Sequence, residues 1–144
     1  MEFFMKMKPP TATAQERKIK IIKGRPVFFD TPKVREARAI LMNHLSMHKP
    51  RRPLEGPLEL QVTWLFPKGR NHKDGEWRVT RPDTDNLEKL LKDCMTRTGY
   101  WKDDAQVVRE TVEKKWAADP TGIQIKVSVL EICGEKQAEG EDSE

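Results

Sequence analysis

Two acidic clusters on either side of a helix-length segment constrain the fold of this chain more than any other feature. The first, in residues 81–89, contains Asp83 and Asp85, and the second is Asp103-Asp104. Carboxylates at close range repel one another, so a basic chain that gathers them is typical of a divalent-cation site. Oxygen ligands of this kind suit Mg²⁺, for which Mn²⁺ can substitute. We therefore expect Asp83, Asp85 and Asp104 to converge on one ion.

Charge is distributed unevenly along the chain. Residues 131–144 hold six acidic residues and one basic residue, a net charge of −5, which leaves 26 basic and 17 acidic residues, a net charge of +9, in residues 1–130. A body this basic predicts a polyanionic partner, and nucleic acid is the foremost candidate. We expect one domain over residues 1–133, followed by an acidic and disordered tail over residues 134–144.

The apolar and cysteine content indicates the environment of the protein. No apolar run approaches the roughly 20 residues of a membrane span, and no signal peptide is visible. Cys94 and Cys133 form no disulfide framework. We therefore expect a cytoplasmic protein that has no membrane partner.

Hydrophobic patterns predict an α+β fold. Leu58, Leu60, Val62 and Trp64 alternate with polar residues, which is the period of a half-buried strand. Helical spacing of apolar residues predicts helices over residues 32–48 and 82–97. Further strands are expected over residues 2–7, 18–22, 26–29, 106–116 and 122–132, and a turn at residues 120–122 would allow the last two to pair. The aromatic pair Phe28-Phe29 is expected in a strand core, with an exposed edge strand that serves dimerisation as the alternative. The expected architecture is a mixed or antiparallel sheet of about four to five strands with two main helices.

A basic loop is expected just before the second helix, over residues 67–81. It carries the residues for which we expect DNA contacts, which are Lys68, Arg70, Lys73, Trp77, Arg78 and Arg81. Trp77 has two open interpretations: it stacks on an unpaired base, or it packs on the fold.

Each member of the acidic clusters also has an ordinary structural explanation. Asp83 suits a helix N-cap, and Asp85 suits the first turn, where the helix dipole stabilises an acid. Lys89 suits an ion pair with Asp85 one turn earlier, and Asp103-Asp104 suits a turn. Because all of these explanations would have to hold together in a basic chain, we favour metal-dependent phosphodiester cleavage, in which Lys89 offsets phosphate charge or orients water.

In both acidic clusters the sequence resembles a known family, the RusA-type Holliday junction resolvases of phages and prophages. Their signature is [KR]-P-D-x-D-N-L-x-K, then a helix, then D-D-x-Q-V. The corresponding segments here are Arg81-Pro82-Asp83-Thr84-Asp85-Asn86-Leu87-Glu88-Lys89 and Asp103-Asp104-Ala105-Gln106-Val107.

The resemblance implies roles for particular residues. Asp83, Asp85 and Asp104 would bind Mg²⁺, Lys89 would be the essential lysine, and Asp93 and Asp103 would be supporting residues. The resemblance also implies a homodimeric endodeoxyribonuclease, with one active site per subunit, that nicks two opposed strands of a four-way junction in recombination and repair.

Two alternatives remain open. Pro82-Asp83 with Glu113-Lys114-Lys115 fits the P-D…[DE]-x-K pattern of restriction-type nucleases. A non-catalytic module that binds branched DNA would explain the basic charge but not the carboxylates. The two-fold symmetry of a four-way junction independently predicts a homodimer, with its interface on the first strands or on residues 32–48, away from the acidic clusters.

Overall fold

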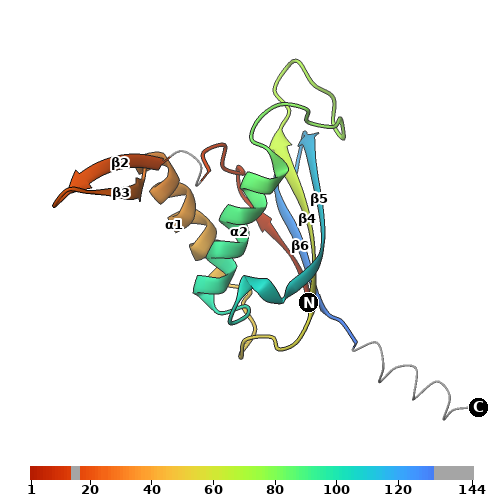
Figure 1. Cartoon of the computed structure of the whole chain (residues 1–144). Coiled ribbons are helices and arrows are strands. Elements are labelled where there is room, and N and C mark those ends of the chain that lie inside the picture. Colours follow the sequence, from red (N-terminus) through yellow and green to blue (C-terminus); the bar gives the residue numbers. More distant parts are fainter. Residues whose placement is uncertain (14–16, 132–144) are drawn as a thin grey trace, which may run out of the picture.

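Strand β4 (Leu58–Pro67) lies at the centre of a four-stranded sheet in the computed structural model, which describes residues 1–13 and 17–131. Its even-numbered residues, from Leu58 to Phe66, are buried, as the alternating pattern predicted. β4 pairs in parallel with β5 (Val107–Ala117) and antiparallel with β6 (Gly122–Val129), which in turn pairs antiparallel with β1 (Glu2–Lys6). The order β1-β6-β4-β5 makes this a mixed sheet (Figure 1).

The expected pairing of the last two strands is wrong. β5 and β6 lie on opposite sides of β4, and residues 118–121 connect them across the end of that strand. The turn residues of this segment indicate a reversal of chain direction, which both arrangements share. They carry no information on whether a third strand lies between. β4 lies between β5 and β6 and pairs with both along almost its full length.

Helices α1 (Pro32–Ser46) and α2 (Thr84–Thr98) pack on one face of the sheet (Figure 1). α1 begins where Thr31 Oγ1 accepts a hydrogen bond from Val34 N at 3.4 Å. α2 ends at Gly99, whose φ of 96° lies in the left-handed region that glycine adopts without a steric penalty. The core between helices and sheet is mainly apolar and includes Leu41, Leu45, Leu60, Trp64, Leu87, Leu91, Cys94, Ile123 and Ile125.

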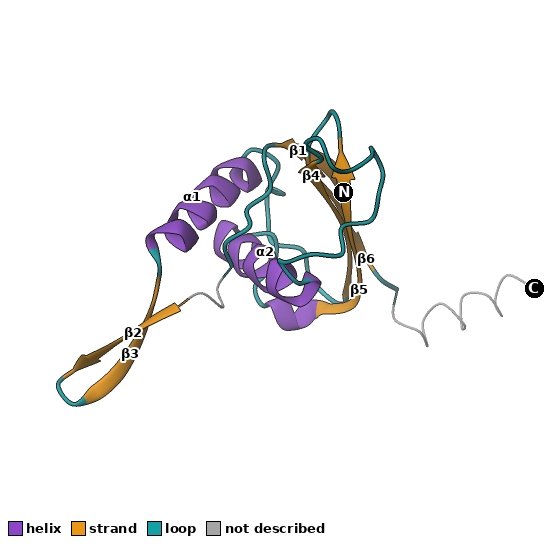
Figure 2. Cartoon of the chain, turned by 90° about the horizontal axis from the view of Figure 1, so that it is seen from above, coloured by secondary structure: helices purple, strands orange, loops and turns teal. Residues whose placement is uncertain are grey.

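Strands β2 (Arg17–Ile22) and β3 (Arg25–Asp30) form a separate hairpin that projects from the body (Figures 1 and 2). The strand positions were predicted, but the expectation that Phe28-Phe29 lies in a strand core is wrong for Phe28, which is 59% exposed. An alternating pattern shows that a segment is extended, but not whether another layer covers it.

The α+β class, the mixed sheet and the two main helices are confirmed. Among the described residues, no helix is long and apolar enough to cross a membrane. The expected disordered tail, residues 134–144, lies outside the described residues, as does Cys133.

Candidate active site

The first acidic cluster lies at the N-terminus of α2. Asp83 occupies the N-cap position with extended backbone angles (φ −72°, ψ 151°), yet its side chain makes no capping hydrogen bond to the described part of the chain. Asp85 follows in the first turn, and both side chains are exposed. The partial positive charge at a helix N-terminus stabilises carboxylates there. The local fold therefore presents two acidic side chains to solvent. The Asp83 carboxylate does not form the capping hydrogen bond that its position would allow.

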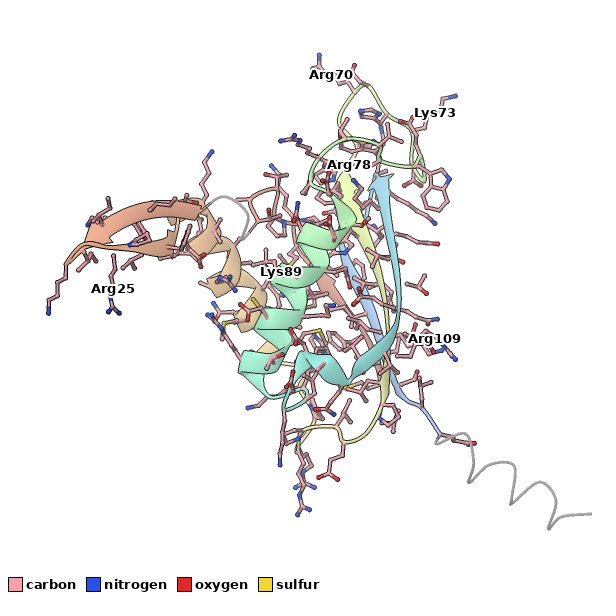
Figure 3. The ribbon with its side chains drawn as sticks, in the orientation of Figure 1. Arg25, Arg70, Lys73, Arg78, Lys89 and Arg109 are labelled. Carbon is pink, nitrogen blue, oxygen red and sulfur yellow. The ribbon has the colours of Figure 1, made fainter. Side chains whose placement is uncertain are left out.

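Lys89 follows Asp85 by one helical turn, and it is also exposed. The buried face of α2, formed by Leu87, Leu90 and Leu91, points to the sheet. Lys89 thus lies on the same side of the helix as Asp85, and its ammonium points away from the core (Figure 3). This is the placement that the helical spacing predicted.

Lys114 on β5 fixes the approach of the chain to Asp83. Its Nζ donates hydrogen bonds to the carbonyl oxygens of Thr80, at 2.8 Å, and Pro82, at 2.7 Å. Burial, and secondarily the charge of Arg78, lower the pKa of Lys114, whereas the charge of Asp83 raises it. The sequence offered this lysine only as part of the restriction-type pattern. In the structure its ammonium holds the backbone immediately before Asp83.

Arg78 anchors the basic loop instead of extending from it. Its guanidinium lies over the rings of the paired residues Phe66 and Trp116, at 4.2 and 4.4 Å from their centroids, and donates to the carbonyl oxygen of Arg81. Burial lowers the pKa of Arg78. Of the expected DNA contacts, this one is largely committed to the fold, and the sequence of the loop did not predict its packing on Phe66 and Trp116.

The other expected DNA contacts are more accessible. Arg70, Lys73 and Arg81 are exposed, and Lys68 is half-buried with its Nζ donating to the Gly69 carbonyl oxygen at 3.3 Å (Figure 3). These four basic side chains line the loop that precedes Asp83, where a phosphate backbone would be attracted.

Trp77 is 57% exposed, and Lys115 Nζ lies 4.8 Å from its ring centroid. It pairs with Lys115 in an isolated bridge along the edge of β5. Because paired residues share a face of a sheet, and Lys115 alternates with the helix-facing Lys114, Trp77 lies on the sheet face opposite α2. Base stacking by Trp77 stays a prediction, and it would occur on the other side of the sheet from Asp83.

The second acidic cluster lies at the opposite end of α2. Asp103 accepts a hydrogen bond from Ala105 N at 2.9 Å and caps the short 3₁₀ helix η1 (Asp104–Gln106) that leads into β5. Gln106 reciprocates by accepting from Asp103 N at 3.2 Å. Asp103 is therefore a structural cap, whereas Asp104 is exposed.

A single chain does not bring the three metal-ligand candidates together. α2 has 15 residues, which span about 22 Å, and Asp83 and Asp85 lie at its start while Asp104 follows its end. Among the described residues, no three His, Cys, Asp or Glu side chains are grouped closely enough to hold a metal ion. The expectation that Asp83, Asp85 and Asp104 converge on one ion is wrong within one chain, because β5 runs parallel to β4 and α2 must return the full length of the sheet between them.

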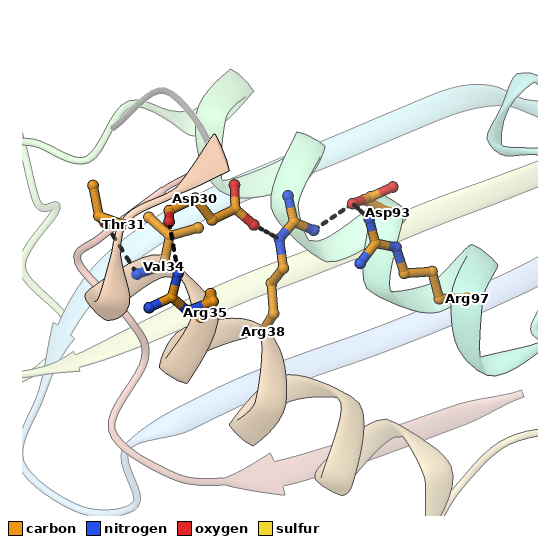
Figure 4. Close-up of polar contacts among 7 residues, drawn as sticks. All are labelled: Asp30, Thr31, Val34, Arg35, Arg38, Asp93 and Arg97. Atoms are coloured by element: carbon orange, nitrogen blue, oxygen red, sulfur yellow. Dashed lines mark hydrogen bonds and ion pairs between the residues drawn. The ribbon is translucent and has the colours of Figure 1, made fainter. Parts of the chain in front are cut away.

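Asp93, the remaining supporting candidate, bridges the two helices. It accepts a hydrogen bond from Arg38 Nη1 on α1 and forms an ion pair with Arg97 Nη2 at 3.4 Å (Figure 4). Arg38 also donates from Nε to Asp30 Oδ2 at 2.7 Å. Sequence patterns gave no sign of Arg38, a charged residue only 7% exposed.

Glu88, which follows Asp85 by one turn on the adjacent face of α2, is buried. Its Oε1 accepts a hydrogen bond from Trp64 Nε1 at 3.0 Å. Burial raises its pKa to about 8. The sequence could have predicted the burial of Glu88, because this residue lies at helical spacing from Leu91 and Met95, which are also buried.

An exposed carboxylate pair at a helix start, beside a basic loop, is a site of the class found in enzymes that cleave nucleic-acid backbones. Comparison with known proteins gives a specific assignment. The family model of the endodeoxyribonuclease RusA matches residues 8–128, and the chain belongs to this family.

Three relatives illustrate the similarity. The crossover junction endodeoxyribonuclease rusA of Lactococcus phage r1t is 32% identical over 133 residues, covering 91% of this chain and 98% of the relative. The uncharacterized protein YqaN of Bacillus subtilis is 28% identical over 98 residues, covering 60% and 66%. The crossover junction endodeoxyribonuclease RusA of Escherichia coli K12 is 53% identical over 34 residues, covering 24% and 28%.

Proposed function

We propose that this protein is a Mg²⁺-dependent endodeoxyribonuclease that resolves four-way DNA junctions by paired, symmetric nicks and works as a homodimer in the bacterial cytoplasm. The observation that carries this proposal is the pair of exposed carboxylates, Asp83 and Asp85, at the start of α2 next to a basic loop, where the side chain of Asp83 does not cap the helix. Carboxylates repel a phosphate backbone unless a cation lies between them, so a purely DNA-binding role leaves this arrangement unexplained.

The donor set fits a hard divalent cation in its chemistry, because carboxylate oxygens are the ligands that Mg²⁺ and Mn²⁺ prefer. Asp83 and Asp85 would supply one part of the coordination shell and Asp104 another. A bound ion would activate water and stabilise the charge that develops on the phosphoryl group. In one chain these two parts lie at opposite ends of α2, a helix about 22 Å long.

Two copies of the chain would remove this separation. If a two-fold axis crosses α2 at right angles, the helices of the two copies run antiparallel, and Asp83 and Asp85 of each copy meet Asp104 of the other. Two equivalent sites then form in one dimer, which matches the two nicks that resolution requires. This arrangement places the interface at the acidic clusters, in contrast to the interface away from them that symmetry alone suggested.

The remaining residues would act on the substrate or on the site itself. Lys89 would hold its ammonium on the Asp85 side of α2, where it can neutralise a phosphate oxygen. Lys114 would keep Asp83 in place through its hydrogen bonds to the Thr80 and Pro82 carbonyl oxygens. Arg70, Lys73 and Arg81 would attract the DNA backbone.

Mixed dimers provide the decisive experiment. Asp85→Asn and Asp104→Asn should each abolish Mg²⁺-dependent cleavage of a plasmid that carries an extruded cruciform, while junction binding is kept. In a co-expressed heterodimer that carries one substitution per chain, one composite site contains both defects and the other contains neither. We therefore expect the heterodimer to recover nicking at one strand and to yield nicked circles, while the wild-type dimer yields linear product.

Three results would contradict parts of this proposal. An inactive heterodimer would mean that each site is built within one chain. Full activity of Asp85→Asn together with an inactive Glu113→Gln would favour the restriction-type alternative. Junction binding by the wild-type protein with no nicking at any Mg²⁺ or Mn²⁺ concentration would leave only the binding-module alternative.

A further inference from the structure

The β2–β3 hairpin, called the arm below, is an unsupported two-stranded ribbon with one apolar face. Residues opposite each other in an antiparallel pair share a face, so Ile19 lies beside Phe28 and Ile21 beside Pro26. Ile19 is 60% exposed, Ile21 76% and Phe28 59%. An isolated two-stranded hairpin is at best marginally stable in water. An apolar face of this kind therefore indicates a binding partner.

The charge of the arm indicates what that partner is. Residues 17–30 contain five basic residues and one acidic residue, a net charge of +4. The acidic residue, Asp30, is at the base of the arm and is paired with Arg38. Arg25 projects near the tip, and Lys20 and Lys23 are also exposed (Figure 3). A ribbon that combines basic side chains with a bare apolar face is suited to nucleic acid, which offers phosphates and base faces side by side.

A second copy of the chain is a poorer match for the arm alone. Six-residue strands are about 20 Å long, and two strands at a spacing of about 5 Å make a ribbon about 10 Å wide, so one face of the arm covers about 200 Å². A stable dimer interface needs about 800 Å² from each partner. Two arms that each carry a charge of +4 would also repel each other.

The arm is connected through α1 to the helix that carries the active-site residues. Asp30, its last residue, accepts from Arg38 Nε at 2.7 Å, and its carbonyl oxygen accepts from Arg35 Nη1 at 3.2 Å. Arg38 in turn donates to Asp93 on α2 (Figure 4). A continuous polar connection thus runs from the base of the arm through α1 to α2, which holds the orientation of the arm relative to Lys89.

The position of the arm relative to Lys89 and the basic loop also suits contact with the DNA substrate. Lys89 lies between the arm, which ends in Arg25, and the basic loop, which carries Arg70 and Lys73 (Figure 3). The view from above agrees with this order, with the hairpin and the loop on opposite sides of α2 (Figure 2). DNA that contacts both elements would therefore reach from one side of α2 to the other.

We propose that the arm is a branch-point wedge, in which Ile19, Ile21 and Phe28 pack against bases unstacked at the crossing of the junction while Lys20, Lys23 and Arg25 contact the flanking phosphates. This inference rests on the proposed function, because it assigns a role within the recognition of branched DNA. Apolar side chains inserted between base steps unstack them and bend the duplex. The wedge would open the crossing next to the strand that the active site cuts.

A fluorescent junction tests the wedge directly. 2-Aminopurine placed at the branch point of a synthetic four-way junction brightens when its base is unstacked, and EDTA keeps the strands intact during the titration. The wild-type protein should raise the fluorescence, and the double variant Ile21→Ser/Phe28→Ser should lose most of that rise and bind the junction about tenfold more weakly. Phe28→Tyr, which keeps an aromatic ring, should retain the signal.

Val129→Ser is the matched control, because Val129 is 55% exposed and lies at the end of β6. It should behave as the wild type, and all variants should melt within a few degrees of it. An equal rise in fluorescence with the double variant would overturn the wedge. So would a double variant that sediments as a monomer where the wild type is a dimer, because the arm would then belong to the subunit interface.

The outcomes separate the wedge from the proposed function. Wild-type protein that cleaves the junction in Mg²⁺ without any rise in fluorescence would overturn the wedge and leave the proposed function standing. Wild-type protein that neither binds nor cleaves the junction would overturn both.

Discussion

Replacing Glu88 by glutamine should stabilise the protein, and the gain should grow with pH. Glu88 is 2% exposed, and its Oε2 has no hydrogen-bond partner among the described residues. Burial raises the pKa of this carboxyl to about 8; the hydrogen bond from Trp64 opposes the shift and the charge of Glu110 adds to it. Glutamine keeps an oxygen that can accept from Trp64 Nε1 and cannot ionise.

The sign and magnitude follow from the two pKa values. Below pH 4.5 the carboxyl is protonated in both the folded and the unfolded chain, so its ionisation contributes nothing to stability. Between pH 4.5 and about 8 the unfolded chain loses this proton and the folded chain keeps it, so the free energy of unfolding falls as pH rises. At about 1.4 kcal/mol per pH unit, the advantage of Glu88→Gln over wild type should increase by about 2–3 kcal/mol between pH 5 and pH 7.

Urea unfolding at pH 5, 6, 7 and 8, followed by circular dichroism, measures this difference. Glu55→Gln, at an exposed position, controls for the general effect of exchanging a glutamate for a glutamine. A difference between Glu88→Gln and wild type that is constant across these pH values would refute the reasoning, since it would mean that Glu88 ionises equally in both states. A variant less stable than wild type at every pH would mean that the carboxylate is needed in the folded protein.

Three further outcomes are expected. Arg38→Met should lower the free energy of unfolding by about 3 kcal/mol, because it removes the cation that Asp30 and Asp93 share; urea titration checks this, with Arg52→Met, at an exposed position, as the control. Lys89→Ala should lose most junction cleavage and keep the wild-type melting temperature, and a melting temperature several degrees lower would instead assign Lys89 a structural role. Binding to junction DNA should weaken steeply with salt: the logarithm of the binding constant should fall against the logarithm of the salt concentration with a slope of about −0.9 per phosphate contacted, and a flat salt dependence would contradict phosphate contacts. Removal of residues 134–144 should not weaken binding, because they carry net negative charge.

Local patterns in the sequence were sufficient for most of the fold. The alternation from Leu58 to Trp64 predicted the central strand, and leucines at helical spacing predicted α2 with Lys89 outside the core. What they could not specify was pairing between elements distant along the chain. The turn at residues 120–122 indicated a reversal of the chain, but the strand order depends on the pairing of both β5 and β6 with β4, which is distant along the chain.

The candidate site divides in the same way. The residue types and their spacing indicated a carboxylate site, and Asp83 and Asp85 lie together at a helix start as predicted. Their separation from Asp104 follows from the parallel pairing of β4 with β5, which no local pattern contains. Lys114 and Arg78 were missed as anchors because each depends on partners on other elements, the Thr80 and Pro82 carbonyl oxygens and the Phe66 and Trp116 rings.

The backbone of the basic loop also closes part of an open sheet edge. Gly75 N donates to the Trp116 carbonyl oxygen at 2.8 Å, Trp116 N donates to the Glu76 carbonyl oxygen at 2.8 Å, and Arg78 N donates to the Lys114 carbonyl oxygen at 3.0 Å. An edge strand with unpaired backbone groups invites another sheet to extend it, which is a common route to aggregation. Because the loop occupies the upper edge of β5, the same segment that presents basic side chains to DNA also prevents sheet-to-sheet association there. Cutting or shortening this loop is therefore expected to lower solubility as well as DNA binding.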